Sequence, residues 1–550
     1  MSKEISPLQK LRYEYKPKLP KALRGTNVSV SFGAAGTPDG DGEKIKELFP
    51  NTFGQKLVTI TEGGDAVPNS PIKVGVVLSG GQAPGGHNVI AGLYDALKNA
   101  NPANKLYGFL KGPAGIMKGN YVELDDEIID SHRNTGGFSM IMSGRDKITT
   151  DEDLSNCKKN FDALDLDGCV IIGGDDSNTN AAVLAEYLRA VGSKTCIIGV
   201  PKTIDGDMKN EYIETSFGFD TACKTYSELI GNICRDATSA VKYWHFVRLM
   251  GRAASHVTLE CGFQTHPNIT LVSEEVSAKN TTLGEIVDYI ADVIVKRAEQ
   301  GKNYGVLLVP EGLPEFISDI KTTIDEISAI LGDKEKELAA MSETAEKIAF
   351  VSGLLSEGGK KVYASLPASA QQVLLTRDSH GNVPLSQVET ERLLIDLVGN
   401  KIKQLKAQGK TNAKFAAQNH FFGYEGRCAM PTNFDADYCY SLGAAAAVLV
   451  RAGLTGYTVN VLNMTKDSDE WVAGGVPVTM MLCIETRKGK DTPVIKKALV
   501  DLEGKPFKYF AANRDEWALN DCYTFPGAIQ YYGPSEVCDI TSKTLALEKN

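Results

Sequence analysis

Short apolar runs that end in glycine-rich polar turns recur along this sequence, and helical patterns follow most of them. Residues 72–78 are a nearly uninterrupted β-rich run, as expected for a strand that is buried on both faces. This run enters a glycine-rich turn at residues 79–86, and a helical pattern extends from about Asn88 to Lys98. Strands that alternate with helices predict an α/β fold with mostly parallel sheets, whose ligands bind at the carboxyl ends of the strands. Later runs of the same kind cover residues 169–172, 196–200, 245–250 and 304–309.

Two parts of the chain depart from this alternation. Residues 1–70 have a mixed composition with Lys/Pro and glycine-rich segments, and we expect them to form an N-terminal extension wrapped on the body. Residues 314–412 are helical and charged, with apolar residues at helix spacing in 334–349 and in 388–408. Because the α/β pattern returns at residue 436, we interpret residues 314–412 as a helical insertion.

The charge balance limits the classes of partner. The 550 residues carry a formal net charge of −10, whereas a general nucleic-acid binder normally has a basic balance. An anionic substrate would therefore have to bind in a local positive cavity inside an acidic body. We expect small-molecule substrates, with neither nucleic acid nor membrane as a partner.

The cysteines and the apolar pattern indicate the compartment. The 11 cysteines include no Cys-x-x-Cys pair, so a zinc site has little support, and those in apolar runs, such as Cys169 and Cys196, read as small buried hydrophobic residues. This usage fits a reducing compartment. Residues 1–4 carry no apolar run, and no stretch approaches the roughly 20 apolar residues that span a bilayer. We therefore expect a cytoplasmic location.

The first glycine-rich turn, SGGQAPGG at residues 79–86, suits a phosphate group. Its glycines let backbone N–H groups approach an anion, and the start of the following helix adds partial positive charge. It matches neither the Walker A pattern nor the Gly-x-Gly-x-x-Gly dinucleotide pattern. The alternative is a tight strand–helix turn without a ligand.

The second turn, GGDDS at residues 173–177, carries two adjacent carboxylates. Beside a phosphate, carboxylates are useful only with a metal, and Mg²⁺ is the natural candidate because it is held by one or two carboxylates and phosphate oxygens. The alternative is helix capping, since Asp and Ser both favour the N-terminal end of a helix.

The segment PKTIDGD at residues 201–207 is the most informative. It places a lysine and a hydroxyl beside two carboxylates at the end of a strand. A lysine can hold the oxygens of a transferring phosphoryl group, and one aspartate can accept a hydroxyl proton. The alternative is a surface turn, because Asp-Gly is a strong turn signal.

These segments together resemble the phosphofructokinases, and the resemblance spans most of residues 72–320 and 413–464. The helical insertion and the N-terminal extension are similar to those of the long, pyrophosphate-dependent branch of that family. The matching blocks, in chain order, are SGGQAPGG at 79–86, SGR at 143–145, GGDDS at 173–177, PKTIDGD at 201–207, MGR at 250–252, PEGL at 310–313 and YEGR at 424–427.

The resemblance implies a reaction and a domain plan. The reaction is reversible transfer of a phosphoryl group from pyrophosphate to the 1-hydroxyl of fructose 6-phosphate, giving fructose 1,6-bisphosphate and phosphate. The fold is α/β, with two Rossmann-like three-layer domains, mostly parallel sheets, a helical insertion and an N-terminal extension. The expected parts are a donor-binding domain at 71–220 and about 431–485, a sugar-phosphate-binding domain at 221–313 and about 413–430, and a C-terminal segment at 486–550 packed on the body.

The resemblance also implies a role for each matched residue. Asp205 would take the proton from the sugar hydroxyl, with Thr203 and Asp207 in support, and Asp175 would ligate Mg²⁺. Arg145 would reach the transferring phosphoryl group. Lys242 and Tyr243 would come from a neighbouring subunit, so we expect a homo-oligomer, a dimer or a tetramer. The donor-binding residues would be Gly80, Gly81, Asp176 and Lys202, and the sugar-phosphate-binding residues Thr203, Asp205, Met250, Gly251, Arg252, Glu311, Tyr424, Arg427, Lys242 and Tyr243.

Two departures from the ATP-using members indicate the donor. Those members carry a glycine where this chain has Asp176, and another glycine where it has Lys202. A carboxylate about 4 Å from a donor phosphate would cost about 4 kcal/mol at an effective dielectric of ~20, enough to exclude ATP, while the lysine adds charge for a compact donor. Tyr424 and Tyr243 also depart from the ATP-using members, which usually have a histidine and an arginine there.

Three other functions have to be weighed. An ATP-dependent 6-phosphofructokinase would have the same fold, and an assay with each donor separates the two. A non-catalytic regulatory subunit disagrees with the joint presence of Asp175, Thr203, Asp205, Asp207 and Arg252. A simple phosphate sensor would leave the carboxylate–lysine cluster unexplained.

Overall fold

The computed structural model describes residues 7–38, 40–377, 387–487, 490–528 and 541–549, together with residues 5, 383 and 539. Within this described part, the chain forms two compact units. Unit 1 comprises Met1–Thr225, Tyr424–Ala498 and Ile529–Asn550, and unit 2 comprises Tyr226–Gly423 and Leu499–Ala528. The chain passes from unit 1 to unit 2 inside helix α8 (Phe219–Ala240).

Unit 1 is built on a large mixed sheet. Among the described residues it has ten strands in the order β1-β2-β14-β13-β8-β7-β3-β4-β5, with β6 paired to β3. The pairs from β13 to β4 are parallel, whereas the two edges are antiparallel. The strands are β1 (Val28–Ala35), β2 (Lys56–Glu62), β3 (Lys73–Ser79), β4 (Lys105–Phe109), β5 (Tyr121–Leu124), β6 (Ser143–Gly144), β7 (Gly168–Gly173), β8 (Cys196–Pro201), β13 (Tyr457–Leu462) and β14 (Val472–Pro477).

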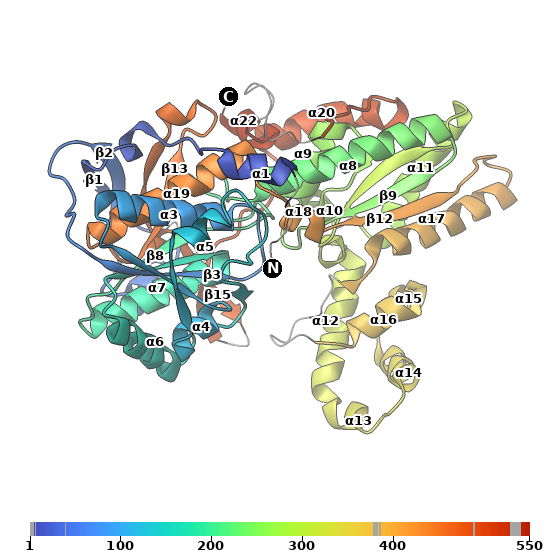
Figure 1. Cartoon of the computed structure of the whole chain (residues 1–550). Helices are drawn as coiled ribbons and strands as arrows, with labels where there is room; N and C mark the ends of the chain where they lie inside the picture. Colours follow the sequence, from blue (N-terminus) through green and yellow to red (C-terminus); the bar gives the residue numbers. More distant parts are fainter. Residues whose placement is uncertain are drawn as a thin grey trace. The chain divides into compact units, whose positions relative to one another are not determined.

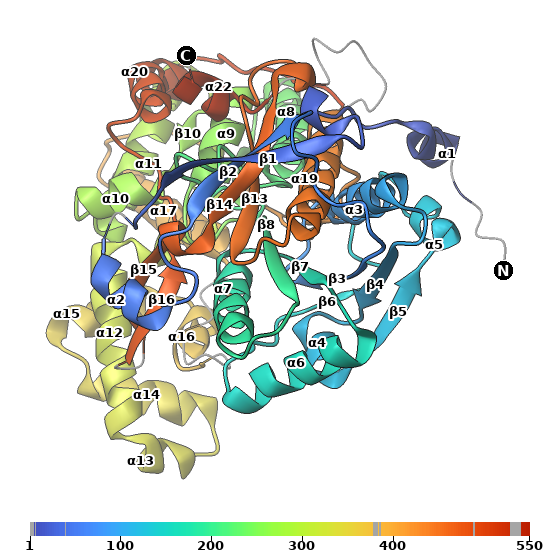
Figure 2. The same ribbon diagram turned by 90° about the vertical axis from the view of Figure 1, so that its left-hand side faces the viewer.

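The central strands are apolar because helices cover both faces of the sheet. Every residue of β7 and β8 is buried, which explains their uninterrupted apolar sequence. Helices α3 and α19 lie on one face, and α4, α6 and α7 lie on the other (Figure 1, Figure 2). The helices of unit 1 are α1 (Pro7–Glu14), α2 (Gly42–Leu48), α3 (Gly86–Ala100), α4 (Pro113–Lys118), α5 (Asp126–Asp130), α6 (Asp151–Leu164), α7 (Asp175–Ala190), α18 (Tyr424–Arg427), α19 (Asn433–Arg451) and α22 (Lys543–Lys549).

Helices α3 and α19 approach each other closely through glycines. A Cβ atom at Gly92 would lie 2.1 Å from the carbonyl oxygen of Tyr440, and one at Gly443 would lie 2.0 Å from that of Val89. A side chain at either position would therefore push the two backbones apart. The two glycines fix the distance between the helices and with it the start of α3, where the turn at residues 79–86 ends.

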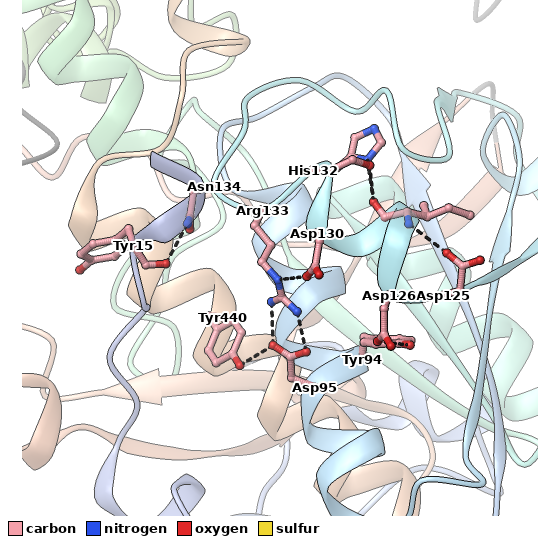
Figure 3. A network of polar contacts seen from close by, with 12 residues as sticks. Tyr15, Tyr94, Asp95, Asp125, Asp126, Asp130, His132, Arg133, Asn134 and Tyr440 are labelled. Atoms are coloured by element: carbon pink, nitrogen blue, oxygen red, sulfur yellow. Dashed lines mark hydrogen bonds and ion pairs between the residues drawn. The ribbon is translucent and has the colours of Figure 1, made fainter. Parts of the chain in front are cut away.

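The N-terminal extension belongs to unit 1. Its strands β1 and β2 extend the large sheet beyond β14. A segment before them docks by polar contacts: Asn134 donates to the carbonyl oxygen of Tyr15 at 3.0 Å, and the Tyr15 hydroxyl donates to Asp437 at 2.9 Å. Next to this contact, Arg133 forms a paired interaction with Asp95 at 2.7 and 2.9 Å (Figure 3). The Asn134 bond joins the extension to the turn that follows α5, and the Asp437 bond joins it to α19, while the Arg133–Asp95 pair fixes that turn on α3.

Unit 2 contains a smaller sheet that is parallel throughout its described strands. The strand order is β10-β11-β9-β12, with Trp244 on β9 fully buried beside Phe246. The strands are β9 (Trp244–Leu249), β10 (Ile269–Thr270), β11 (Gly305–Pro310) and β12 (Ala417–Phe422). The helices are α9 (His256–Thr265), α10 (Ser273–Ala278), α11 (Leu283–Glu299), α12 (Ser318–Asp333), α13 (Glu335–Ala339), α14 (Thr344–Leu354), α15 (Glu357–Ser365), α16 (Ala368–Leu374), α17 (Thr390–Ala407) and α20 (Lys505–Leu519).

The described part of residues 314–412 is mainly helical and belongs to unit 2. The stretch 334–349, which has apolar residues at helix spacing, contains α13 and the start of α14, with a break at residues 340–343. Leu338 and Val351, on either side of the break, both reach the core of unit 2. A buried ion pair between Arg248 on β9 and Glu391 on α17, at 2.7 Å, ties the end of this segment to the sheet.

The expected domain limits can be compared with the two units. Residues 424–430, which the sequence places with the sugar-phosphate domain, lie in unit 1. The C-terminal segment 486–550 is divided, because Leu499–Ala528 belongs to unit 2 and the remainder to unit 1. A last pair of strands, β15 (Leu482–Arg487) and β16 (Lys490–Ile495), forms a hairpin in unit 1. None of the described helices combines the length and apolar character that a membrane-spanning helix needs.

Candidate active site

Three loops of unit 1 meet because their strands are neighbours. Strand β7 lies between β3 and β8, and all three run parallel, so the loops after them leave the same edge of the sheet. Direct bonds join the loops: Ser177 donates to Ser79 through their hydroxyls at 2.8 Å, and the backbone N–H of Lys202 donates to the carbonyl oxygen of Gly173 at 2.9 Å. The turns predicted from the sequence at 79–86, 173–177 and 201–207 therefore form one site.

Cationic side chains surround the first glycine-rich turn, residues 79–86, which we call the cationic turn. Gly80 has a φ of +83°, which favours glycine, and a Cβ atom there would lie 3.3 Å from Lys202 Nζ. A Cβ atom at Gly81 would lie 2.9 Å from Arg427 Nη1 and 3.6 Å from Arg145 Nη2. The absence of side chains at Gly80 and Gly81 therefore lets three cationic groups lie close to the backbone of this turn, and together they would attract an anion.

Lys202 is buried although it is charged. Only 6% of its surface is exposed, and burial together with the positive charges of Arg427 and Arg145 lowers its pKa to about 8. An anion bound beside it would favour the protonated form. Arg427 has a buried Nε atom without a hydrogen-bond partner among the described residues. Both observations fit a site shaped for a multiply charged anion.

The aspartates of the site differ in their surroundings. Asp205 has a buried Oδ1 atom that lacks a hydrogen-bond partner among the described residues, so it is available to accept a proton. Burial and the neighbouring charge of Asp205 raise the pKa of Asp207 to about 7. Asp175 begins α7 and is partly exposed.

The loop that carries these aspartates has a defined conformation. The Thr203 hydroxyl accepts a hydrogen bond from the backbone N–H of Asp205 at 3.1 Å, and the Ser216 hydroxyl donates to the carbonyl oxygen of Thr203 at 2.9 Å. Gly206 has a φ of +74°, which turns the chain between the two aspartates. The loop thus holds Asp205 in one place and does not need the substrate to order it.

Asp176 lies at the edge of the site. Its side chain is 53% exposed and forms an ion pair with Lys147 at 3.3 Å. Asp176 therefore stands in solvent next to a cation, whereas Lys202 is in the interior.

The carboxylates permit a metal ion that arrives with a phosphate. Among the residues that the structure describes, no group of three or more His, Cys, Asp or Glu side chains is arranged to hold a metal ion by itself. This agrees with the chemistry of Mg²⁺, which keeps several waters and binds through one or two carboxylates and substrate phosphate oxygens. Asp175, next to the cationic turn, can supply such a ligand.

Lys497 is a residue of the site that the sequence patterns did not reveal. Its Nζ atom lies 3.4 Å from Asp175 and 4.0 Å from Asp207. It follows the hairpin of β15 and β16, far along the chain from both aspartates, and no local motif marks it. The backbone N–H of Ala498 donates to the carbonyl oxygen of Asp207 at 2.7 Å, which holds this segment beside the aspartates.

A second group of predicted residues lies in unit 2, after β9 and β11. Gly251 has a φ of +133°, and its N–H donates to the carboxylate of Glu311 at 3.2 Å. Glu311 is buried, while Arg252 beside it is exposed. The backbone N–H of Met250 donates to the carbonyl oxygen of Phe422 at 3.0 Å. This turn presents an exposed arginine next to a fixed carboxylate.

The residues predicted for the sugar phosphate are divided between the units. Thr203, Asp205, Tyr424 and Arg427 belong to unit 1, and Arg427 lies at the cationic turn predicted for the donor. Tyr424 is 68% exposed. In unit 2, Lys242 is exposed and its Nζ atom lies 5.0 Å from the centre of the Tyr243 ring, while Met250, Gly251, Arg252 and Glu311 form the turn described above.

Comparison with known proteins gives a consistent result. A family model described as Phosphofructokinase matches residues 73–450. The chain is 50% identical over 546 residues to the pyrophosphate–fructose 6-phosphate 1-phosphotransferase of Porphyromonas gingivalis, covering 99% of both chains. It is 49% identical over 557 residues to the enzyme of that name from Treponema pallidum, covering 99% of this chain and 97% of the relative.

A plant relative and a solved structure extend the comparison. The beta subunit of the pyrophosphate–fructose 6-phosphate 1-phosphotransferase of Solanum tuberosum is 50% identical over 546 residues, covering 99% of this chain and 94% of the relative. The crystal structure of a pyrophosphate-dependent phosphofructokinase from Marinobacter aquaeolei matches with a TM-score of 0.53 at 15% identity, covering 82% of this chain and 93% of that one. The second match bears on the fold alone.

Proposed function

The chain belongs to the phosphofructokinase family, and on that basis we propose that it transfers a phosphoryl group reversibly from pyrophosphate to fructose 6-phosphate. The acceptor is the 1-hydroxyl, and the products are fructose 1,6-bisphosphate and phosphate. The observation that carries the proposal is the glycine turn at Gly80 and Gly81, beside which Lys202, Arg145 and Arg427 lie. A small, multiply charged donor matches that concentration of positive charge.

The donor binds at the cationic turn. Lys202 contributes a buried charge, and the two arginines offer planar groups that can bond phosphate oxygens in pairs. Arg145 reaches the phosphoryl group that is transferred. Because these groups are in place before the donor arrives, they neutralise charge in the transition state with little rearrangement.

Asp205 accepts the proton of the sugar hydroxyl. Its buried Oδ1 atom has no hydrogen-bond partner among the described residues, and the Thr203 hydroxyl fixes the backbone of Asp205 through the 3.1 Å bond. Asp207 supports the same loop. Deprotonation as the hydroxyl attacks phosphorus is the step in which a positioned base helps most, because phosphoryl transfer needs little covalent chemistry from the protein.

Enzymes of the phosphofructokinase family generally use a divalent metal, and we take that metal to be Mg²⁺ held by Asp175. When it is bound, Mg²⁺ neutralises part of the charge on the pyrophosphate oxygens. Asp175 suits this task because it stands at the start of α7, on the same edge of the sheet as the cationic turn.

The sugar phosphate binds through the residues after β9 and β11. Arg252 supplies an exposed cation, and Glu311 accepts the Gly251 N–H and so fixes that turn. Tyr424 and Arg427 contribute from unit 1. Lys242 and Tyr243 contribute to the site of a neighbouring subunit, so the active protein is a homo-oligomer.

Donor choice rests on Asp176 and Lys202. Family members that use ATP carry glycine at both positions, and here the first position holds a carboxylate paired with Lys147. The pair fills space and presents charge next to the turn, whereas Lys202 favours the compact donor. A cytoplasmic location completes the proposal and is supported by the buried thiols of Cys157, Cys169 and Cys439.

A coupled assay tests the proposal. Purified protein with fructose 6-phosphate and Mg²⁺ is given pyrophosphate or ATP as the sole donor, and fructose 1,6-bisphosphate formation is followed. We expect rapid turnover with pyrophosphate and turnover at least about tenfold slower with ATP, since the charge of Asp176 is partly screened by solvent and by Lys147. Faster turnover with ATP, or none with either donor, would contradict the proposal.

A further inference from the structure

Lys497 brings a positive charge to the donor site from outside the part of the chain that the family model matches. That match ends at residue 450, and Lys497 follows the hairpin of β15 and β16. The hairpin and the residues after it form hydrogen bonds with the loops at residues 173–177 and 201–207. The Ile495 N–H donates to the Thr179 hydroxyl at 3.2 Å, and that hydroxyl donates to the carbonyl oxygen of Asp175 at 2.9 Å.

The anchoring of this segment continues on both sides of Lys497. Ile495 is buried in a core cluster that also contains Met208, which immediately follows the loop at residues 201–207. Ala498 bonds the backbone of Asp207 at 2.7 Å, and the Lys496 N–H donates to the carbonyl oxygen of Met481 at 3.1 Å. Lys497 is thus held near the two carboxylates, because the backbone N–H groups of the residues immediately before and after it both form hydrogen bonds.

The distances define what kind of contact Lys497 makes. Its Nζ atom is 3.4 Å from Asp175 Oδ2 and 4.0 Å from Asp207 Oδ2, and both distances exceed those of a normal N–H···O hydrogen bond. The contact of Lys497 with each aspartate is therefore an ion pair and not a hydrogen bond, and a divalent cation can compete for the same carboxylate. The Asp175 side chain keeps 28% of its surface exposed, so a cation from solvent can reach it.

We propose that Lys497 is a positioning residue that holds Asp175 and Asp207 together in the metal-free site and competes with the divalent cation for Asp175. The inference rests on the proposed function, because that function makes Asp175 the metal ligand. Two cations that share one carboxylate oxygen repel each other. Lys497 therefore keeps the site closed to free metal, and metal that arrives with pyrophosphate overcomes the repulsion because the donor brings negative charge with it.

Binding of Mn²⁺, measured by electron paramagnetic resonance on the full-length protein without substrates, tests the competition directly. Lys497→Met should bind Mn²⁺ about three- to tenfold more tightly than the unmodified protein, since an ammonium next to the ligand is removed. Lys497→Arg, which keeps the charge, should bind as the unmodified protein does. If Lys497 only supported the fold, its replacement by Met would weaken Mn²⁺ binding or leave it unchanged. The direction of the change in Mn²⁺ affinity therefore separates the two roles.

Two further variants exclude general charge effects. Lys496→Met removes the same charge one residue away, from an exposed side chain, and should leave Mn²⁺ affinity unchanged. Lys497→Met combined with Asp175→Asn should lose the gain in affinity. An equal gain in Lys496→Met, or a gain that survives Asp175→Asn, would overturn the proposal.

Steady-state kinetics give a second readout. In Lys497→Met the half-saturating Mg²⁺ concentration should fall several-fold, while KM for fructose 6-phosphate stays unchanged. A tenfold or greater rise in KM for pyrophosphate with unchanged Mn²⁺ binding would identify Lys497 as a donor ligand and overturn the competition. Failure of the proposed function itself would appear differently, as absence of pyrophosphate-dependent turnover in the unmodified protein.

Discussion

At the scale of single residues, Lys202 is unusual because it is almost fully buried and has two arginines as neighbours. Its pKa is lowered to about 8 by burial, and Arg427 and Arg145 add to the shift. Such a lysine changes its charge close to the pH at which enzymes work, whereas an exposed lysine does not. The strength of donor binding should therefore depend on pH through this one residue.

The pH dependence has a definite sign. Below pH 8 Lys202 is protonated and holds the donor, and above pH 8 it loses its proton. KM for pyrophosphate should then rise by up to about tenfold per pH unit. In Lys202→Arg the guanidinium stays protonated, so this rise should be absent. Steady-state kinetics from pH 6.5 to 9.5 measure both, and an identical rise in the two proteins would assign it to pyrophosphate itself.

The role of Asp205 as base predicts a large rate loss. Asp205→Asn keeps the size of the side chain but cannot take a proton, so kcat should fall by about 10² to 10⁴ with little change in KM. Thermal unfolding of the variant should match that of the unmodified protein, because Oδ1 of Asp205 has no partner among the described residues to lose. Turnover near the unmodified rate would exclude Asp205 as the base.

Donor choice is a third property of single residues. Replacing Asp176 and Lys202 together by glycine should depress the use of pyrophosphate and open the site to ATP. The ratio of kcat/KM with ATP to kcat/KM with pyrophosphate should rise by about tenfold or more, because one charged side chain is removed at each position. Asp176→Gly alone tests whether the exposed carboxylate contributes, and an unchanged ratio in the double variant would contradict the account.

At the scale of elements, the position of the cationic turn depends on how α3 and α19 pack. The turn at residues 79–86 leads directly into α3, and α3 rests on α19 at Gly92 and Gly443. Parallel neighbours β3, β7 and β8 then bring the other loops to the same edge. The geometry of the site therefore depends in part on packing at residues outside it, such as Gly92 and Gly443.

Gly443→Ala tests this dependence. The added Cβ atom would lie 2.0 Å from the carbonyl oxygen of Val89, so the helices must separate and the free energy of unfolding should fall by about 1–3 kcal/mol. Gly332→Ala in α12 is the matched control, since a Cβ atom there meets nothing within 4 Å and should be neutral or slightly stabilising. Urea unfolding measures both, and equal stabilities would show that the close approach of the helices is not needed.

At the scale of the whole molecule, the proposed sugar site draws on both units and on a neighbouring subunit. Lys242 and Tyr243 are exposed or partly exposed and belong to unit 2, whereas Asp205 belongs to unit 1. If they complete the site of another subunit, two defective proteins can repair each other.

Mixed oligomers of Asp205→Asn and Lys242→Ala provide that test. Each variant alone should be impaired, the first in kcat and the second in KM for fructose 6-phosphate. Refolding the two together as a dimer should restore about a quarter of the normal activity, because half of the dimers are hybrids with one intact site. Activity no higher than the average of the separate variants would place Lys242 in its own subunit's site or in none.

Much of this architecture could be predicted from the sequence. A strand at residues 72–78 was expected where β3 (Lys73–Ser79) lies, because strands buried on both faces are continuously apolar. The apolar residues at helix spacing in 334–349 indicated helical structure there, but that spacing did not show the break between α13 and α14 at residues 340–343. Leu338 and Val351, on either side of the break, both reach the core of unit 2.

The sequence by itself predicted an α/β fold and marked the residues of the glycine-rich turns after apolar strands as candidates for binding a ligand, because such turns lie at the edge of an α/β sheet where ligands bind. The tertiary structure decided which of those residues meet: it buried Lys202 against the glycine turn, placed Arg427 at the donor end and brought Lys497 to Asp175. The physical reason is that local patterns record the periodicity of one element at a time. A contact between distant parts of the chain arises only when several elements pack together, and its charge and burial follow from that packing.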